Sequence, residues 1–199
     1  MKLYVTQLSP FARMARIVVH EKGLQDRVEI VAAQTRTADS PYYGINPSGR
    51  VPYLVRDDGV GMEESELICA WLGRPQFAIP AADDWELRRL YGFARSMVDG
   101  VSVWNRELAR PENERSPTVI AHEAARAARM ADLWEKEIEH PLLRRPFDLL
   151  QLTLGCCLAL EARNPAFRWR EGRPKLVRWF EPIAARPSFI ATAPSLPLP

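Results

Sequence analysis

The chain has 199 residues, of which 47% are hydrophobic and 26% are charged, and its formal net charge at pH 7 is +2. This length suffices for one sizeable core or for two small domains. A charge so close to zero, with no basic run interleaved with aromatic residues, excludes the electrostatic footprint of a nucleic-acid-binding protein. No signal-peptide-like start and no run of about eighteen apolar residues occurs, so we expect a cytoplasmic protein that does not enter a membrane.

The first part of the chain alternates short strand-like runs with amphipathic helical runs. The strands expected there are residues 2–6, 28–32, 51–55 and 61–63, and the helices are residues 10–22 and 65–72. The sequence Asp57-Asp58-Gly59 between the last two strands predicts a hairpin. This order of strands and helices is that of a thioredoxin-like domain, which we place at residues 1–73.

The rest of the chain has a different sequence pattern. A proline-containing connector, GRPQFAIPAA, predicts a linker at residues 74–82. Residues 83–199 read as one helix after another and predict an all-helical C-terminal domain. Long helices are expected to start near Asp84 and Ser116, and the apolar helix that begins at Asp148 is expected at the centre of the bundle. The predicted fold class is therefore α/β followed by all-α.

The cysteines give no sign of metal binding. Cys69, Cys156 and Cys157 are an odd number without metal-ligand spacing, and the histidines lie far from them in the sequence. We expect buried, reduced thiols and no metal site. The last two fall in an apolar helix, which favours packing over a redox pair.

Ser9 and Pro10 stand where the first strand meets the first helix. The simplest interpretation is an N-cap followed by proline at the first helical position. In a thioredoxin-like fold, however, this corner faces two other segments, and the three together predict more than a cap.

The first of these segments is Val51-Pro52, before the third strand. A proline there is typically cis and leaves backbone groups for pairing with an extended peptide. The second is Glu64-Ser65, at the start of the next helix. It either caps that helix or binds a carboxylate through the helix N-terminus. Together with Ser9, these segments predict a groove for a short, anionic, thiol-bearing peptide.

Three segments of the N-terminal part resemble the glutathione-site segments of cytosolic glutathione S-transferases: MKLYVTQLSPFARMARIVVHEKGL, NPSGRVPYLV and ESELICAWL. The helical part is similar to a bacterial subgroup of these enzymes with a serine in the SPF motif, through MVDGVSVWNRELARP, FDLLQLTLGCCLAL and WREGRPKLVRWFEPIAARPSF. The resemblance covers essentially the whole chain. It implies a two-domain, homodimeric detoxification enzyme that takes glutathione as co-substrate, transfers it to a hydrophobic electrophile and needs no prosthetic group.

The resemblance implies that Ser9 holds the glutathione sulfur as a thiolate. Lowering a thiol pKa of about 8.5 by about two units requires roughly 2.7 kcal/mol of preferential thiolate stabilisation. One hydrogen bond to a charged acceptor contributes about 1.5 to 3 kcal/mol, and the helix dipole adds several tenths to about 1 kcal/mol. Ser9 is therefore the expected catalytic residue. Thr6, at the end of the strand, is the weaker candidate because no helix N-terminus supports it.

Further glutathione contacts follow from the same resemblance. Val51, next to Pro52, is expected to pair with the cysteinyl backbone. Glu64 is expected to bind the γ-glutamyl ammonium and Ser65 the neighbouring carboxylate. Arg50 is expected to meet the glycyl carboxylate, the alternative being a solvated loop arginine.

Residues of the long helices carry the remaining expectations. Asp99 resembles a position that reaches the glutathione of a dimer partner, and its alternative is a surface or packing acid. Phe11, Trp104 and Asn105 are expected to line the electrophile pocket, although a tryptophan on such a helix is as often part of the core.

The start of the apolar helix departs from the usual capping box of the family, because Asp148 and Gln151 replace Ser or Thr and Asp. We expect Asp148 to accept from the first-turn amides and Gln151 to reach back.

Two other functions stay open at this point. One is a glutathione-dependent reductase, which the missing cysteine at position 9 disfavours. The other is a catalytically silent binding or regulatory protein of the same fold. For an enzyme, the reactions to be considered are conjugation, peroxide reduction, dehalogenation and isomerisation.

Overall fold

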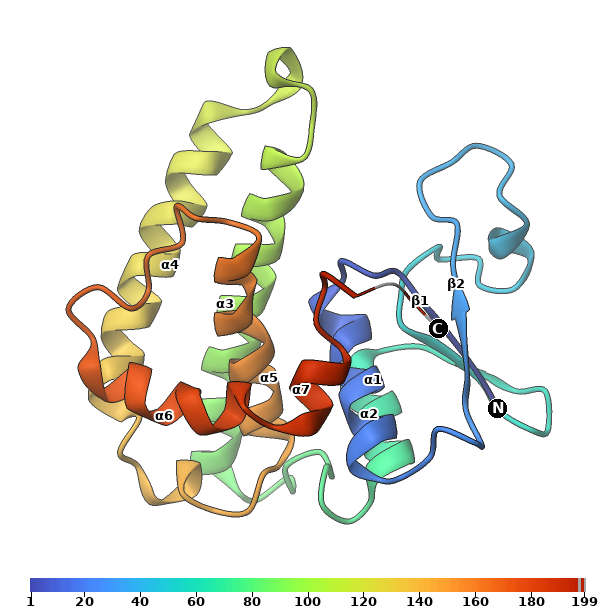
Figure 1. The fold of residues 1–199 in the computed structure, drawn as a ribbon, viewed down its shortest axis with the longest axis horizontal. Helices are drawn as coiled ribbons and strands as arrows, with labels where there is room; N and C mark the ends of the chain where they lie inside the picture. The colour runs from blue at the N-terminus through green and yellow to red at the C-terminus, as the bar shows by residue number, and fades with distance from the viewer. Residues whose placement is uncertain (197, 199) are drawn as a thin grey trace. The chain divides into compact units, whose positions relative to one another are not determined.

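The computed structural model describes residues 1–196 and residue 198, and its contacts divide the chain into two compact units (Figure 1). The N-terminal unit comprises Met1–Ile79 and Arg186–Pro199, and the helical unit comprises Pro80–Ala185. In the described part of the chain, no helix has both the length and the apolar character that crossing a membrane requires.

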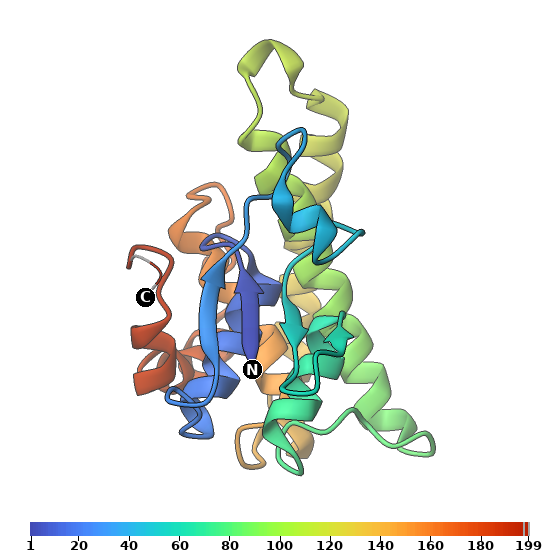
Figure 2. The ribbon, with the colours of Figure 1, turned by 90° about the vertical axis from the view of Figure 1, so that its right-hand side faces the viewer.

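The N-terminal unit is built on a four-stranded sheet with the strand order β2-β1-β3-β4 (Figure 2). Its strands are β1 (Lys2–Val5), β2 (Glu29–Ala32), β3 (Tyr53–Val55) and β4 (Gly61–Met62). β1 runs parallel to β2 and antiparallel to β3, and β3 and β4 form the predicted hairpin. Leu3 and Val5 of β1 are fully buried, as the alternation of strand side chains requires of residues that share one face.

The helices of this unit are α1 (Pro10–Glu21), α2 (Ser65–Gly73) and the short α7 (Pro187–Ala191), with a 3₁₀ turn, η1 (Pro41–Gly44), in the loop before β3. α1 packs against both α2 and α7 (Figure 1). The apolar side of α1 supplies much of the core, with Met14, Ile17 and Val18 completely buried. The thioredoxin-like arrangement expected from the sequence is thus confirmed.

The C-terminal boundary differs from the expectation of a helical domain at residues 83–199. The segment from Arg186 onward belongs to the N-terminal unit, because α7 is held on α1 by specific contacts. Arg13 of α1 donates a hydrogen bond to the Phe189 carbonyl at 2.9 Å, and its guanidinium lies over the Phe189 ring. The expected linker, residues 74–82, is likewise divided between the two units, because the boundary along the chain falls between Ile79 and Pro80.

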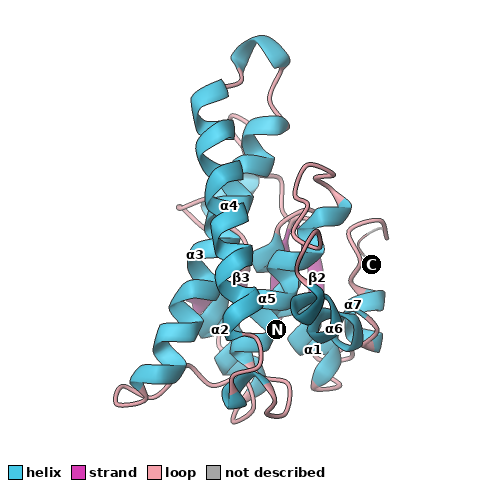
Figure 3. Ribbon diagram, turned by 90° about the vertical axis from the view of Figure 1, so that its left-hand side faces the viewer, coloured by secondary structure: helices cyan, strands magenta, loops and turns pink. Residues whose placement is uncertain are grey.

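The helical unit consists of long helices joined by short 3₁₀ turns (Figure 3). Its helices are α3 (Trp85–Leu108), α4 (Pro117–Glu137), α5 (Leu149–Leu158) and α6 (Pro174–Ala184), and its turns are η2 (Glu112–Glu114), η3 (Pro141–Leu143) and η4 (Ala159–Ala162). α3 packs along α4 and α5, and α6 contacts both of these. Every residue of α5 is buried, as expected of the central helix.

The predicted N-caps of these helices are present. Asp84 accepts from the Leu87 amide at 3.0 Å, and Ser116 accepts from the Val119 amide at 3.3 Å. Each cap satisfies one of the amide groups that a helix start leaves without an intrahelical partner. The starts of α3 and α4 are therefore determined locally.

The capping box at α5 is only half as expected. Asp148 accepts from the Gln151 amide at 3.1 Å, but the Gln151 side chain does not reach back to Asp148. It donates instead to the Arg145 carbonyl at 2.8 Å, and Arg145 in turn pairs with Asp148 at 2.6 Å. The carboxylate of Asp148 thus takes a charged partner, while the amide of Gln151 holds the preceding loop.

All three cysteines are buried, as expected. Burial raises the pKa of the Cys157 thiol, and the nearby Cys156 and Asp99 raise it further. This thiol is therefore protonated at neutral pH and serves as a packing group.

Candidate functional site

The register of the sheet brings three separate segments to one end of it. Tyr4 of β1 lies opposite Tyr53 of β3, and these strands are antiparallel, so the residues that follow β1 lie at the same end as those that precede β3. β4 is antiparallel to β3, so the start of α2 comes to that end as well. The segments 6–9, 51–52 and 64–65, which the sequence analysis had linked, are therefore neighbours.

Ser9 forms the cap of α1 within this group. Its Oγ accepts a hydrogen bond from the Ala12 amide at 3.2 Å, and Pro10 occupies the first helical position. A serine hydroxyl has one proton to donate besides its acceptor lone pairs, so capping leaves the O–H group available. Among the residues that the structure describes, no acceptor engages this proton. Thr6 lies one turn earlier, where its carbonyl accepts from the Ser9 amide at 3.3 Å.

The Val51–Pro52 peptide bond is cis, as the sequence analysis expected. The carbonyl just before it, that of Arg50, accepts hydrogen bonds from the Tyr42 hydroxyl and from Asn46 Nδ2, the latter at 3.0 Å. Both donors are buried, and burial raises the pKa of the Tyr42 hydroxyl, which therefore keeps its proton. These contacts fix the backbone on which Val51 is presented.

Sequence reasoning did not single out Tyr42 or Asn46. The only local signal is that both stand in the loop PYYGINPSG, a stretch of turn-forming residues. A buried tyrosine and asparagine in such a loop need polar partners, and the Arg50 carbonyl supplies one for both.

A further hydrogen bond joins the same loop to the residue before the N-terminus of α2. Ser48 Oγ donates to Glu63 Oε1 at 2.7 Å and accepts from the Arg50 amide at 3.1 Å. Since Glu63 immediately precedes Glu64, this contact couples the position of the loop to that of the α2 N-terminus. The sequence analysis did not predict it.

Glu64 and Ser65 begin α2 in an unusual way. Glu64 has φ 73° and ψ 119°, and its side chain makes no capping hydrogen bond, so the simple capping interpretation does not hold for Glu64. A positive φ is uncommon for a residue other than glycine and often marks a functional constraint. The Glu64 residue is exposed, whereas Ser65 is buried at the first helical position. Backbone amides and a positive helix dipole at this end suit a carboxylate ligand.

The remaining N-terminal candidates lie in the same unit. Arg50 is exposed and Phe11 is half-buried in the first turn of α1. Arg50 adds a positive charge beside the cis peptide. The arrangement therefore offers a hydroxyl donor, a helix N-terminus, an exposed carboxylate and an exposed guanidinium.

Asp99, Trp104 and Asn105 belong to α3 of the helical unit. Asp99 is exposed. Trp104 is buried and meets the Phe167 ring edge-on, with 6.3 Å between ring centroids, which is the core position given as its alternative. Asn105 is half-buried, and its side-chain carbonyl accepts from Asn164 Nδ2 at 2.9 Å.

Comparison with known families matches residues 8–74 to a family described as glutathione S-transferase, N-terminal domain. The matched region holds all three segments of the candidate site except residues 6 and 7. Two curated relatives match over the full length. An uncharacterised GST-like protein of Escherichia coli K12, YibF, is 28% identical and covers 98% of each chain. Glutathione S-transferase 3 of Zea mays is 28% identical over 100% of this chain and 96% of its own.

A similar solved structure carries a ligand. It is that of a glutathione transferase family member from Pseudomonas fluorescens Pf-5 with bound glutathione. It superposes with a TM-score of 0.85 at 27% identity and covers 98% of this chain and 99% of its own.

Proposed function

We propose that this chain, whose residues 8–74 match the N-terminal domain of glutathione S-transferases and whose full length is similar to such proteins, binds glutathione at the candidate site and transfers the thiol to a hydrophobic electrophile. The thiolate forms a carbon–sulfur bond with the electrophile. In a substitution, the leaving group departs with the electron pair of its bond. In an addition, the electron pair of an activated double bond moves onto the electrophile, which then takes a proton from solvent. The thiol proton goes to solvent when the thiolate forms.

The observation that carries this proposal is the hydrogen bonding of Ser9. Its acceptor function is used by the Ala12 amide, so its proton remains for the glutathione sulfur. The first turn of α1 has no acidic residue, and its N-terminus adds a favourable field for a thiolate. Ser9 therefore stabilises the charged form of the thiol without acting as a general base. Thr6 has no helix N-terminus beside it and contributes less to the stabilisation of the thiolate.

The peptide lies along the other two segments. The backbone of Val51, held by the anchored Arg50 carbonyl and the cis bond to Pro52, pairs with the cysteinyl residue of glutathione. The γ-glutamyl carboxylate meets Ser65 and the α2 amides, and the ammonium meets the exposed carboxylate of Glu64. The Arg50 guanidinium pairs with the glycyl carboxylate of glutathione.

The electrophile and the assembly complete the proposal. Of the residues expected to contact the electrophile, Phe11 is the half-buried candidate of the N-terminal unit, and Trp104 and Asn105 are the candidates of the helical unit. The protein acts as a cytoplasmic homodimer in detoxification, and Asp99 reaches the glutathione of the other copy. The exposure of Asp99 supports this role, since its carboxylate is available to a second molecule. Glutathione is a co-substrate, and no prosthetic group takes part.

Calorimetric titration with glutathione, followed by a turnover assay with 1-chloro-2,4-dinitrobenzene, tests the proposal. Ser9→Ala and Ser9→Gly are expected to bind glutathione while the pKa of the bound thiol, read from thiolate ultraviolet absorbance, rises by about one to two units. Glycine is the matched control for helix capping, because it replaces a capping serine at a cost of only a few tenths of a kcal/mol.

The outcomes separate the candidate functions. An unchanged thiol pKa in both Ser9 variants rejects the assignment of Ser9, and a rise in Thr6→Ala alone transfers the role to Thr6. Glutathione binding without turnover of several electrophiles favours a silent binding protein. Absence of binding at millimolar glutathione removes the enzymatic proposal altogether.

A further inference from the structure

Ser48 stands between two of the three segments of the candidate site. Its hydroxyl donates to Glu63 Oε1 at 2.7 Å and accepts from the Arg50 amide at 3.1 Å. Arg50 directly precedes Val51, and Glu63 directly precedes Glu64. One exposed serine therefore links the segment before the cis proline to the start of α2.

The backbone at Arg50 is held on both sides. Its amide donates to Ser48, and its carbonyl accepts hydrogen bonds from the buried Tyr42 and Asn46 side chains. The peptide bond from Arg50 to Val51 is trans, and in a trans peptide the carbonyl and the amide hydrogen point in opposite directions. Anchoring the Arg50 carbonyl therefore turns the Val51 amide away from the two buried donors.

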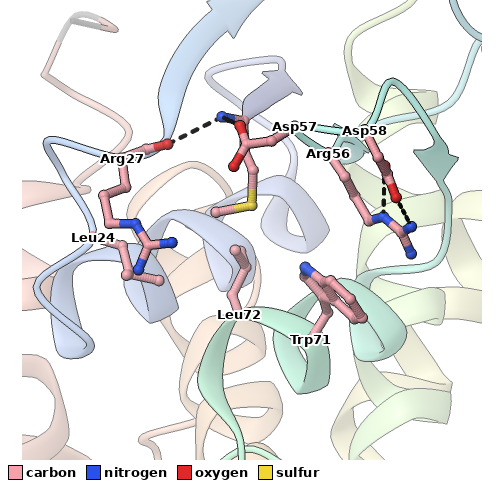
Figure 4. A pocket seen from close by; sticks show the side chains of 8 residues that line it. Leu24, Arg27, Arg56, Asp57, Asp58, Trp71 and Leu72 are labelled. Carbon is pink, nitrogen blue, oxygen red and sulfur yellow. Dashed lines mark hydrogen bonds and ion pairs between the residues drawn. The ribbon is translucent and has the colours of Figure 1, made fainter.

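The β3–β4 hairpin and α2 are joined at the end away from this link. Arg56 pairs with both carboxylate oxygens of Asp58, and its guanidinium lies over the Trp71 ring of α2 at 4.7 Å from the centroid (Figure 4). The Asp58 carboxylate also accepts from the Val60 amide at 3.1 Å, which closes the turn. The turn of the hairpin is thus fixed to the C-terminal half of α2. At the other end, the hydrogen bond from Ser48 supplies the corresponding contact.

The Glu63 carboxylate is committed to this link. Among the residues that the structure describes, its side chain has no hydrogen-bond or ion-pair partner besides Ser48. Its charge also reaches the loop: burial is the main cause that raises the pKa of the Tyr42 hydroxyl, and the Glu63 carboxylate raises it further. Glu64, the next residue, has φ 73°, a region in which a residue other than glycine has little room to adjust. A shift of Glu63 is therefore passed on to Glu64.

We propose that the hydrogen bond between Ser48 and Glu63 couples the two ends of the peptide site, so that a γ-glutamyl group held at α2 strengthens the binding of the cysteinyl residue at Val51. This inference rests on the proposed function. A γ-glutamyl end that immobilises Glu64 also steadies the link through Glu63 and Ser48. The cysteinyl backbone then meets a partner that has already lost its freedom, so less ordering remains to be done. Ser48 and Glu63 are positioning residues, since they act through Glu64 and Val51.

Calorimetric titration of the full chain with glutathione tests the inference, together with the KM for glutathione and kcat in the turnover assay. Ser48→Ala is expected to raise the dissociation constant and the KM by about threefold to tenfold, the range for one lost hydrogen bond. The kcat at saturating glutathione and the pKa of the bound thiol should stay as in the wild type, because the change leaves Ser9 in place. Ser48→Thr keeps a hydroxyl and should restore most of the affinity.

The coupling itself is measured with double variants. Glu63→Ala breaks the same hydrogen bond, so adding Ser48→Ala to it should cause less than about twofold further loss. Ser48→Ala should also cost less affinity in a Glu64→Gln background, which lacks the charge that holds the γ-glutamyl ammonium. Thr37→Ala is the matched control, because it removes the hydroxyl of an exposed threonine from the loop before β3. It should leave the dissociation constant unchanged.

The outcomes separate this inference from the proposed function. Absence of glutathione binding by the wild type rejects the proposed function, and the inference falls with it. Wild-type binding with an unchanged affinity in Ser48→Ala, an equal loss in Thr37→Ala, or losses that simply add in the double variants overturns the inference alone. A lower kcat or a raised thiol pKa in Ser48→Ala would show a general distortion of the site and would overturn it as well. Circular dichroism confirms that each variant is folded.

Discussion

Glu21 in α1 and Arg186, the residue before α7, form a two-pronged ion pair. Arg186 Nε donates to Glu21 Oε1 at 2.9 Å and Nη2 donates to Oε2 at 2.6 Å. The Ser188 hydroxyl donates to the same carboxylate. Burial alone would raise the pKa of Glu21, but the hydrogen bonds from Arg186 and Ser188 outweigh it and lower the pKa overall. A single carboxylate thus fastens the end of the chain to its first helix.

Replacing Glu21 with glutamine is expected to lower the free energy of unfolding at pH 7 by about 1.5 to 3 kcal/mol. The change removes a charged acceptor that is only 11% exposed and breaks its ion pair with Arg186. Urea denaturation measures the loss. Glu29→Gln is the control, because Glu29 forms a long, exposed ion pair with Lys2 and should cost less than about 1 kcal/mol. Equal losses in the two variants would contradict the special role of Glu21.

The contribution of Glu21 should also depend on pH. Its pKa in the folded protein is below the unfolded value of about 4.3, so its stabilising effect is full above that value and is lost as the pH falls through the folded pKa. The difference in unfolding free energy between wild type and Glu21→Gln should therefore shrink in acid. Denaturation curves collected from pH 7 to about pH 3 measure it, and a constant difference would refute the pKa shift.

The two tasks of Ser9 are separable. Ser9→Ala is expected to lower the free energy of unfolding by about 1 kcal/mol, because the Ala12 amide loses its acceptor, whereas Ser9→Gly should cost only a few tenths. Both variants should raise the pKa of the bound thiol alike. Thermal unfolding and thiolate absorbance measure the two effects. A thiol pKa that follows stability across the variants would show that Ser9 acts only through the helix.

Two glycines should respond to alanine with opposite signs. A Cβ at Gly73 would lie 2.6 Å from Phe77 Cδ2 and 2.9 Å from Val18 Cγ1, in the contact between α1 and α2. Gly73→Ala should destabilise by about 1 kcal/mol or more, since both neighbours are fully buried. Gly92 in α3 has open space around it, so Gly92→Ala should stabilise by about 0.5 to 1 kcal/mol. Chemical denaturation of both variants checks the signs.

The capping hydrogen bond of Asp148 at α5 and its ion pair with Arg145 can be tested separately. Asp148→Ala should destabilise by about 1 to 2 kcal/mol, because it removes both the acceptor for the Gln151 amide and the partner of Arg145. Asp148→Asn keeps a capping oxygen and removes only the charge, so it should retain most of the stability. Similar losses in the two variants would assign the effect to the ion pair instead of the cap.

The elements that sequence reasoning predicted are those set by local rules. Ser9, Asp84 and Ser116 cap their helices because a hydroxyl or carboxylate placed before a helical run meets the same free amides in any context. The β3–β4 hairpin follows from its turn residues in the same way. The periodicity of the hydrophobic residues and the capping residues together thus predict the order of the elements and most of their bounds.

What the sequence did not reveal depends on contacts between distant residues. The hydrogen bond from the Tyr42 hydroxyl to the Arg50 carbonyl can be recognised only in the folded loop, since many tyrosines in loops simply face solvent. The link from Ser48 to Glu63 spans two strands and has no periodic signature. Sequence reasoning therefore named candidate ligand contacts, but it did not find the residues that fix the backbone around them.

The dependence of the N-terminal unit on α7 has a consequence for synthesis on the ribosome. The sheet, α1 and α2 leave the ribosome first, yet the segment that covers α1 is translated only after the whole helical unit. A nascent chain must therefore carry an incomplete N-terminal unit, with the surface of α1 that later contacts Phe189 still exposed to solvent, until α7 has been translated. Shielding of that helix by a chaperone would be needed only during this interval.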